Sequence, residues 1–268
     1  MKDIQEHILL TDLNDNGILR LTLNDIGNKN ALSESMMQKL LKAISKASKD
    51  NSVRVIIITS TGNVFCSGHN LKEINEANKE EDKGKSYYLD LFKTCSKLMQ
   101  SIINCPKPVI AEVNGIATAA GCQLVASCDL AISSNSSKFA TPGVNIGLFC
   151  STPMVALSRN VSKKDSMKML LTGDMISADE AKRISLINDC VPDDQLTKSV
   201  MDLAKKISEK SLAVLKIGKE AFYKQLQLNI EDAYEYTSMV MTKNMMIDDA
   251  SEGISSFLDK RSPKWKNK

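Results

Sequence analysis

Apolar positions along the first half of the chain follow two different periods. Residues 17–23 alternate as a strand does, and residues 53–59 form a β-branched run typical of a strand buried on both faces. In residues 33–49 the apolar side chains recur at helical spacing, and Ser35 with Gln38 is the predicted capping pair of that helix. These segments predict strands interleaved with helices.

The same alternation continues toward the middle of the chain. Residues 77–86 are rich in charge and predict a surface loop, and residues 87–103 again have helical spacing. Two prolines then precede a predicted strand at Val109–Val113, and Asp129 is expected to tie a later strand to a neighbour. Strands and helices in this order predict an α/β fold.

The second half of the chain is mostly helical in pattern. Residues 177–180, Ser-Ala-Asp-Glu, form a capping box, and residues 186–191 predict a short strand. Helices are expected from Asp194, Ser211, Ile230 and Asp248. We therefore divide the chain into a β/α core at residues 1–192 and a helical region at residues 193–268. Methionines 239, 241, 245 and 246 are expected in the core or at a subunit contact.

Composition narrows the class of protein. The 268 residues carry a net charge of +3, which is too small to indicate nucleic acid but is compatible with an anionic small-molecule ligand. Seven cysteines without a CxxC pair favour reduced thiols, and two histidines exclude a His-rich metal site. With no apolar run of membrane length and no targeting pattern, we expect a cytoplasmic protein without membrane or nucleic-acid partners.

Two loops of the sequence are candidates for chemistry. Loop one, residues 62–73, follows the buried strand, and loop two, residues 115–121, follows Val109–Val113. Each leads into a predicted helix, so each could offer a free backbone N–H to a common point, as an oxyanion hole requires. A single small-residue loop after a strand is common in proteins and does not by itself indicate a function. The presence of two such loops is what predicts an oxyanion hole.

Four segments carry a family resemblance. They are Phe-Cys-Ser-Gly-His-Asn-Leu-Lys at 65–72, Asn-Gly-Ile-Ala-Thr-Ala-Ala-Gly-Cys-Gln-Leu at 114–124, Phe-Ala-Thr-Pro at 139–142 and Leu-Thr-Gly-Asp-Met-Ile-Ser-Ala-Asp-Glu-Ala at 171–181. Together they resemble the crotonase (enoyl-CoA hydratase/isomerase) superfamily, over nearly the whole chain. Within it, residues 67–72 and 147–153 are similar to the enoyl-CoA hydratase domain-containing group, whose reaction is uncertain.

The resemblance implies a fold, a ligand and an assembly. The fold would be a spiral of ββα turns with a C-terminal helical region used in trimerisation, giving a homotrimer or a dimer of trimers. The ligand would be an acyl-CoA thioester, as in fatty acid metabolism, with coenzyme A as part of the substrate and no separate cofactor or metal. The backbone amides of His69 and Ala120, the latter followed by Gly121, would hold the thioester carbonyl.

Further positions follow from the same resemblance. The backbone of Ser67 and Leu71 would line the adenine side of coenzyme A, and Lys29 could meet one of its phosphates. Lys264 or Lys266 could do the same from the C-terminal end. Cys150 and Ser151 could line the acyl pocket; Cys150 as a nucleophile is the less favoured interpretation, because no histidine is placed by sequence to activate it.

Two departures from the family pattern concern the reaction. Hydratases of this family use two glutamates for proton transfer, and this chain has Gln123 and Gly143 at those positions. A carboxamide does not exchange protons usefully at neutral pH, and glycine has no side chain. We therefore expect ordinary hydration to be absent or very weak.

Two functions from different classes stay open at this point. The first is a lyase- or isomerase-type acyl-CoA enzyme that isomerises, decarboxylates, hydrolyses or slowly hydrates its thioester; decarboxylation needs no general base. The second is a non-catalytic acyl-CoA-binding or scaffold protein. The ring of His69 could replace the missing acid or base, but packing is the favoured interpretation.

Overall fold

The computed structural model describes residues 7–267, in which a six-stranded sheet forms the centre. Only the edge pair β1–β2 is antiparallel, and the other pairs are parallel. The sheet order is β1 (Leu9–Leu13), β2 (Ile18–Leu23), β3 (Val55–Ser60), β5 (Val109–Val113), β7 (Leu130–Ser134) and β10 (Asp189–Val191). The buried β-branched run thus forms a central strand, as the sequence predicts.

A second, smaller sheet includes two short strands from the segments that the sequence analysis assigned to loops one and two. Its order is β4 (Val64–Cys66), β6 (Ile116–Thr118), β8 (Lys138–Ala140) and β9 (Ile176–Ser177). The chain runs from β3 through β4 into α2 (Leu71–Ala77), and from β5 through β6 into α4 (Ala120–Ser127). These repeated ββα turns confirm the α/β crotonase-type fold expected from the resemblance.

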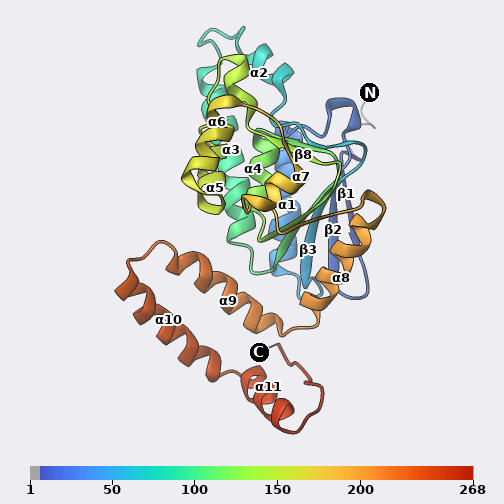
Figure 1. Ribbon diagram of the computed structural model, residues 1–268, viewed down its shortest axis with the longest axis vertical. Helices are drawn as coiled ribbons and strands as arrows, with labels where there is room; N and C mark the ends of the chain where they lie inside the picture. Colours follow the sequence, from blue (N-terminus) through green and yellow to red (C-terminus); the bar gives the residue numbers. More distant parts are fainter. Residues whose placement is uncertain (1–6, 268) are drawn as a thin grey trace.

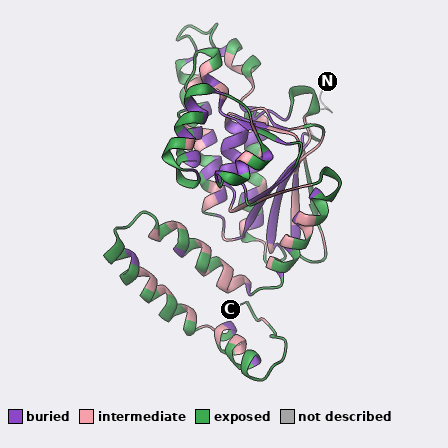
Figure 2. Ribbon diagram, viewed as in Figure 1, coloured by how far each residue is buried: buried purple, intermediate pink, exposed green. Residues whose placement is uncertain are grey.

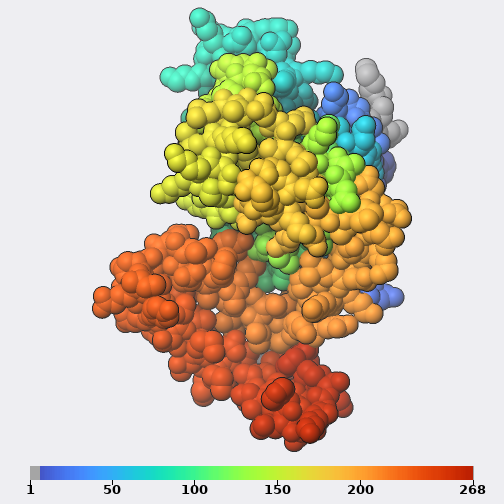
Figure 3. All heavy atoms as spheres, in the orientation of Figure 1, coloured from blue at the N-terminus to red at the C-terminus, as the bar shows by residue number. Residues whose placement is uncertain are grey.

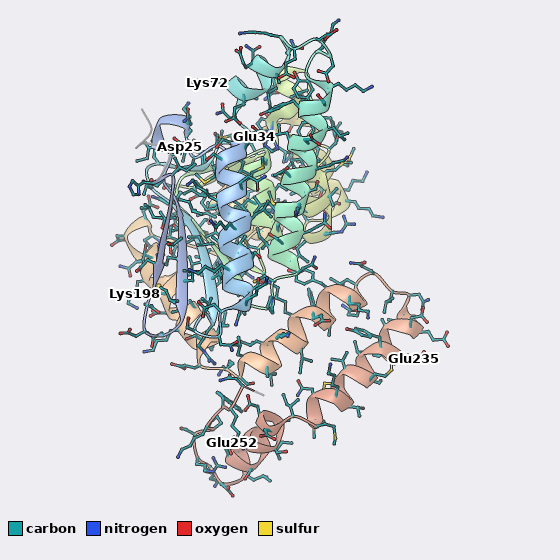
Figure 4. The ribbon with its side chains drawn as sticks, turned by 180° about the vertical axis from the view of Figure 1, so that it is seen from behind. Asp25, Glu34, Lys72, Lys198, Glu235 and Glu252 are labelled. Carbon is teal, nitrogen blue, oxygen red and sulfur yellow. The ribbon has the colours of Figure 1, made fainter. Side chains whose placement is uncertain are left out.

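Helices α1 (Glu34–Lys49) and α3 (Lys85–Ile103) lie side by side on one face of the core (Figure 4). The buried face of α1 contains the expected apolar residues Met36, Leu40 and Ile44. Its cap is Ser33, which accepts a hydrogen bond from the Met36 N–H, so the predicted pair at Ser35 is wrong. Leu32, just before this cap, forms an isolated parallel bridge with His69, so the chain is still extended there.

Shorter elements complete the core. They are η2 (Ile26–Asn28), η3 (Pro142–Ile146), η4 (Asp193–Gln195), α5 (Pro153–Asn160), α6 (Lys163–Thr172) and α7 (Ala178–Arg183). The Ser177 hydroxyl caps α7 at the Glu180 N–H, as the capping box predicts.

The C-terminal helices fall into two groups, one packed on the central sheet and one extending below the core. Helix α8 (Leu196–Ser208) packs Leu196, Val200 and Ala204 against the central sheet. Helices α9 (Leu212–Gln225), α10 (Ile230–Met245) and α11 (Asp248–Leu258) extend below the core and are largely exposed (Figures 1 and 2). The four methionines of residues 239–246 are exposed in the single chain, so they are not core residues. The two-part division of the chain stays a prediction.

A buried polar cluster connects α9 to the core. Lys219 Nζ on α9 lies 2.6 Å from Asp129 Oδ2 and 3.0 Å from the carbonyls of Ile102 and Lys107. Asp129 also accepts hydrogen bonds from the Val109 N–H and the Tyr223 hydroxyl. Burial raises the pKa of Asp129, while the ammonium opposes that effect. Asp129 therefore ties β5 to α9, in keeping with its expected structural role.

Candidate functional site

Loops one and two meet at two small residues. Gly68 has φ 94°, and a Cβ added there would lie 2.9 Å from the Ala119 Cβ and 3.4 Å from the Ala120 nitrogen. The Thr118 hydroxyl donates to the Ser67 carbonyl at 3.1 Å, and β4 pairs with β6 beside this contact. Gly68 is therefore required both by its backbone angle and by the close approach of the two loops.

Two backbone N–H groups at this junction are free to bind a ligand. Within residues 7–267, neither the His69 N–H nor the Ala120 N–H donates to a protein acceptor. Ala120 is the first residue of α4, where an N–H has no partner inside the helix. Two such donors on touching loops can polarise one carbonyl oxygen, which is the chemistry of an oxyanion hole.

The start of α4 is held in an unusual conformation. Ala119 has φ 51° and ψ −119°, which a residue with a Cβ adopts only at a cost. Its N–H donates to the Ala140 carbonyl at 2.9 Å, and its carbonyl accepts from the Gln123 N–H at 3.0 Å. A Cβ at Gly121 would overlap the Cys66 carbonyl. The surrounding strands thus fix the direction of the Ala120 N–H.

Gln123 lies one turn after Ala120 on α4 and is 4% exposed. Its Oε1 accepts a long hydrogen bond, 3.8 Å, from the Cys95 thiol of α3. Burial raises the pKa of Cys95 to about 12, so the sulfur keeps its proton. The sequence pattern missed Cys95, because 28 residues separate it from Gln123 and only the packing of α3 on α4 joins them.

The space beside Gly143 is already filled. A Cβ added at Gly143 would lie 2.9 Å from both the Cys150 Sγ and the Leu148 carbonyl oxygen. Cys150 is buried, and burial raises the pKa of its thiol. A side chain at position 143 therefore requires the backbone near Leu148 to move. The raised pKa also argues against Cys150 as a nucleophile.

The ring of His69 packs within the protein. Its Nδ1 lies 3.3 Å from the Leu32 carbonyl oxygen, and the ring meets Phe92 edge to face at 5.6 Å between centroids. In this arrangement Nδ1–H donates to the carbonyl, while Nε2 is buried without a partner among the described residues. Burial lowers the pKa of His69, so the ring is neutral at pH 7.

The other predicted positions fall into two groups. Lys29 lies next to loop one, because its carbonyl accepts from the Ser67 N–H, and Leu71 starts α2 with its side chain exposed. Ser151 is exposed beside Cys150. Lys264 and Lys266 are instead on the tail after α11, where Lys266 pairs with Asp248 at 3.3 Å. Within one chain this tail lies below the core, away from loop one (Figure 1).

The part of the chain that the structure describes contains neither a candidate metal cluster nor a candidate membrane-spanning helix. No group of three or more histidine, cysteine or acidic side chains there could hold a metal ion. None of the helices in residues 7–267 has the length and apolar character to cross a membrane.

Comparison with known proteins identifies relatives over almost the whole chain. A family model described as enoyl-CoA hydratase/isomerase matches residues 14–268. The chain is 49% identical over 261 residues to enoyl-CoA hydratase domain-containing protein 3, mitochondrial, of Xenopus laevis, covering 97% of this chain and 87% of the relative. It is 30% identical to 2,3-dehydroadipyl-CoA hydratase of Escherichia coli, covering 94% and 96%.

Solved structures of the same family superpose closely on this chain. The crystal structure of human enoyl coenzyme A hydratase domain-containing protein 3 superposes with a TM-score of 0.92 at 47% identity, covering 97% of this chain and all of that one. An enoyl-CoA hydratase of Mycobacterium smegmatis gives a TM-score of 0.92 at 45% identity, covering 96% and 98%.

The relatives contradict one prediction and establish the family. Several are named mitochondrial, so the predicted cytoplasmic location is wrong. Free cysteines indicate a reducing compartment without saying which one. A family match over residues 14–268, relatives at 30% identity or more and the ββα spiral together show that this chain belongs to the enoyl-CoA hydratase/isomerase family, the crotonase superfamily.

Proposed function

We propose that this protein binds an acyl-CoA thioester at the His69 and Ala120 amides and decarboxylates a malonyl-type acyl group without hydrating double bonds. The observation that carries the proposal is the pair of N–H groups that have no protein acceptor within residues 7–267, on loops in contact at Gly68 and Ala119. Two fixed donors stabilise the negative charge that develops on a thioester oxygen when an enolate forms.

The proposed decarboxylation proceeds without a catalytic base, because no proton has to be removed from the substrate. The bond between the α-carbon and the carboxylate breaks, its electron pair moves into the enolate, and carbon dioxide leaves. The two amides stabilise the enolate oxygen, and each is expected to lower the barrier by ~3 kcal/mol. The α-carbon then takes one proton from water, which gives the shortened acyl-CoA.

The side chains around the amides support this choice over hydration. Hydration needs one group to deprotonate water and another to protonate the α-carbon. Gln123 is a carboxamide oriented by the Cys95 thiol, and the space beside Gly143 is filled by Cys150. Burial raises the pKa of both thiols and lowers the pKa of His69, so none of the three is charged at neutral pH.

The second candidate function is non-catalytic binding of an acyl-CoA. The protonation states of the side chains at the junction favour it. None of the titratable groups there is poised to exchange a proton near pH 7. A binding protein needs the two amides but no turnover, whereas the decarboxylase must release carbon dioxide.

The test replaces one amide and leaves the side chains in place. Ala120 is the first residue of α4, where proline fits the helix and replaces the N–H with a ring carbon. Ala120→Gly keeps the N–H and is the matched control. Malonyl-CoA, alkyl-malonyl-CoA and crotonyl-CoA are incubated with each variant, and the products are measured by mass spectrometry.

We expect carbon dioxide loss from a malonyl-type thioester, slowed about 10²–10³-fold by Ala120→Pro and little changed by Ala120→Gly. Thioester binding that Ala120→Pro weakens, with no turnover of any substrate, would identify the binding protein instead. Hydration of crotonyl-CoA at a rate typical of enzymes would refute the proposal.

We also propose a homotrimer or a dimer of trimers. Large apolar side chains are exposed along the helices below the core, among them Phe222 at 56% and Met246 at 81%. Apolar surface of this extent on one region indicates a partner. Light scattering after size exclusion would measure the mass, and a monomer at micromolar concentration would contradict this assembly.

A further inference from the structure

A cavity region lies at the opposite end of the core from loops one and two. A cavity of about 460 Å³ lies between the core and the helices α9 and α10. An adjoining cavity of about 480 Å³ shares Pro106, Lys216 and Glu220 with it. Seen from behind, α9 and α10 pass below the ends of α1 and α3, and the space-filling view shows them as a separate lobe (Figures 3 and 4).

Lys107 is the unusual residue of the first cavity. It is only 3% exposed, and its ammonium forms no hydrogen bond or ion pair with any residue between 7 and 267. Its own carbonyl is occupied by Lys219. Burial, helped by Arg54 and Lys216, lowers the pKa of Lys107. Most of the Lys107 side chain is buried, but its ammonium reaches the cavity that the residue lines, and an anion there would supply the ion-pair partner that it lacks.

Further positive charge surrounds the same space. Lys216 of α9 and Lys243 of α10 line the cavity, with Glu220 as the opposing acid. The first residues of α9, Leu212 and Ala213, line it as well, so the positive end of a 14-residue helix adds to the field. Part of this end is already used, since the Leu212 N–H donates to the Asn267 side chain.

We propose that this cavity is a binding site for a small phosphate-bearing anion, with Lys107 as its central contact. Lys216 and Lys243 hold the same group from the two helices, so the ligand bridges the core and the α9–α10 pair. Ile217 and Ile247 supply an apolar wall, and the volume suits a ligand up to the size of a nucleotide.

The site is separate from the thioester site. Lys107 precedes β5, whereas loop two follows the other end of that strand. Five residues of strand place the two sites roughly 15–20 Å apart. A ligand here therefore acts on the joint with the C-terminal helices and leaves the His69 and Ala120 amides free.

Thermal unfolding with and without ligand tests the proposal. Inorganic phosphate and ADP are each added at constant ionic strength, with sodium chloride as the reference. We expect at least one of the two to raise the Tm of the wild type by about 5 °C at saturation. Lys107→Met should abolish the ligand-dependent increase in Tm, because it removes the central cation of the cavity.

Lys206→Met, an exposed change on α8, is the matched control and should respond to ligand as the wild type does. Calorimetry should show binding to Lys107→Met, and to the Lys216→Met/Lys243→Met double variant, at least about tenfold weaker than to the wild type. If ADP binds more tightly than phosphate, the adenine base contacts the apolar wall of the cavity. If the two bind equally well, the site recognises the phosphate group alone. Equal Tm values in phosphate, ADP and chloride, or full binding by Lys107→Met, would overturn the proposal.

Discussion

Removing the Lys219 ammonium should loosen the joint between α9 and the core. Its Nζ makes three hydrogen bonds, one of them to the Asp129 carboxylate at 2.6 Å, and its side chain is only 7% exposed. Lys219→Met keeps most of the aliphatic stem but leaves Asp129 charged and buried. Breaking such a pair from one side costs ~3–5 kcal/mol.

Features of this site place the expected loss near the lower end of that range. In the variant, the Asp129 carboxylate still accepts hydrogen bonds from the Val109 N–H and the Tyr223 hydroxyl, which partly compensate its charge. Lys219 also borders a cavity of about 480 Å³, from which water can reach the Ile102 and Lys107 carbonyls. We therefore expect Lys219→Met to lower the free energy of unfolding by about 3 kcal/mol.

Urea denaturation at one fixed protein concentration measures this loss. Lys206→Met is the control, because that lysine is exposed on α8, and should change the free energy of unfolding by less than about 0.5 kcal/mol. A double-mutant cycle with Asp129→Asn should give a coupling of at least ~1.5 kcal/mol. If Lys219→Met proves as stable as Lys206→Met, the cluster does not hold α9 in place and the reasoning fails.

Three further predictions concern the junction of the two loops. Ala119→Gly should raise the free energy of unfolding by about 1 kcal/mol in urea titrations, since glycine accepts φ 51° without strain; a loss of stability would contradict this. Gly121→Ala should cost more than about 2 kcal/mol, because its Cβ would overlap the Cys66 carbonyl; an unchanged urea midpoint would refute it. Burial lowers the pKa of His69, so the unfolded state binds more protons below its usual pKa of about 6.5, and stability present above that pH is lost as the pH falls. Wild type should therefore lose more stability between pH 7 and 5 than His69→Gln, and parallel stability curves would show that the ring is not desolvated.

Local patterns determined most elements of this protein. The helix at residues 34–49, the buried strand at residues 55–60 and the capping box at Ser177 all depend on neighbours within one or two turns of chain. The two glycine-containing loops were also visible in the sequence, as were Gln123 and Gly143 at the positions where the resemblance places the hydratase glutamates.

The short strands were decided only by tertiary structure. Strands β4, β6 and β8 have three residues each, too few to show a period, and they form because successive ββα turns bring them into register. The same holds for the helix cap at Ser33, where the bridge between Leu32 and His69 fixes the point at which the chain becomes helical.

Contacts between distant residues decided the surroundings of the thioester site and the attachment of α9 to the core. Cys95 meets Gln123 across 28 positions, Cys150 fills the space beside Gly143, and Lys219 meets Asp129 across 90 positions. No local pattern encodes such pairs, because side-chain periodicity reports which face is buried and not what lies against it. The sequence alone thus indicated the family, the two loops, and Gln123 and Gly143 at the positions that the resemblance assigns to carboxylates. Only the packed structure showed the free amides, the neutral side chains around them and the unpaired Lys107 below the core.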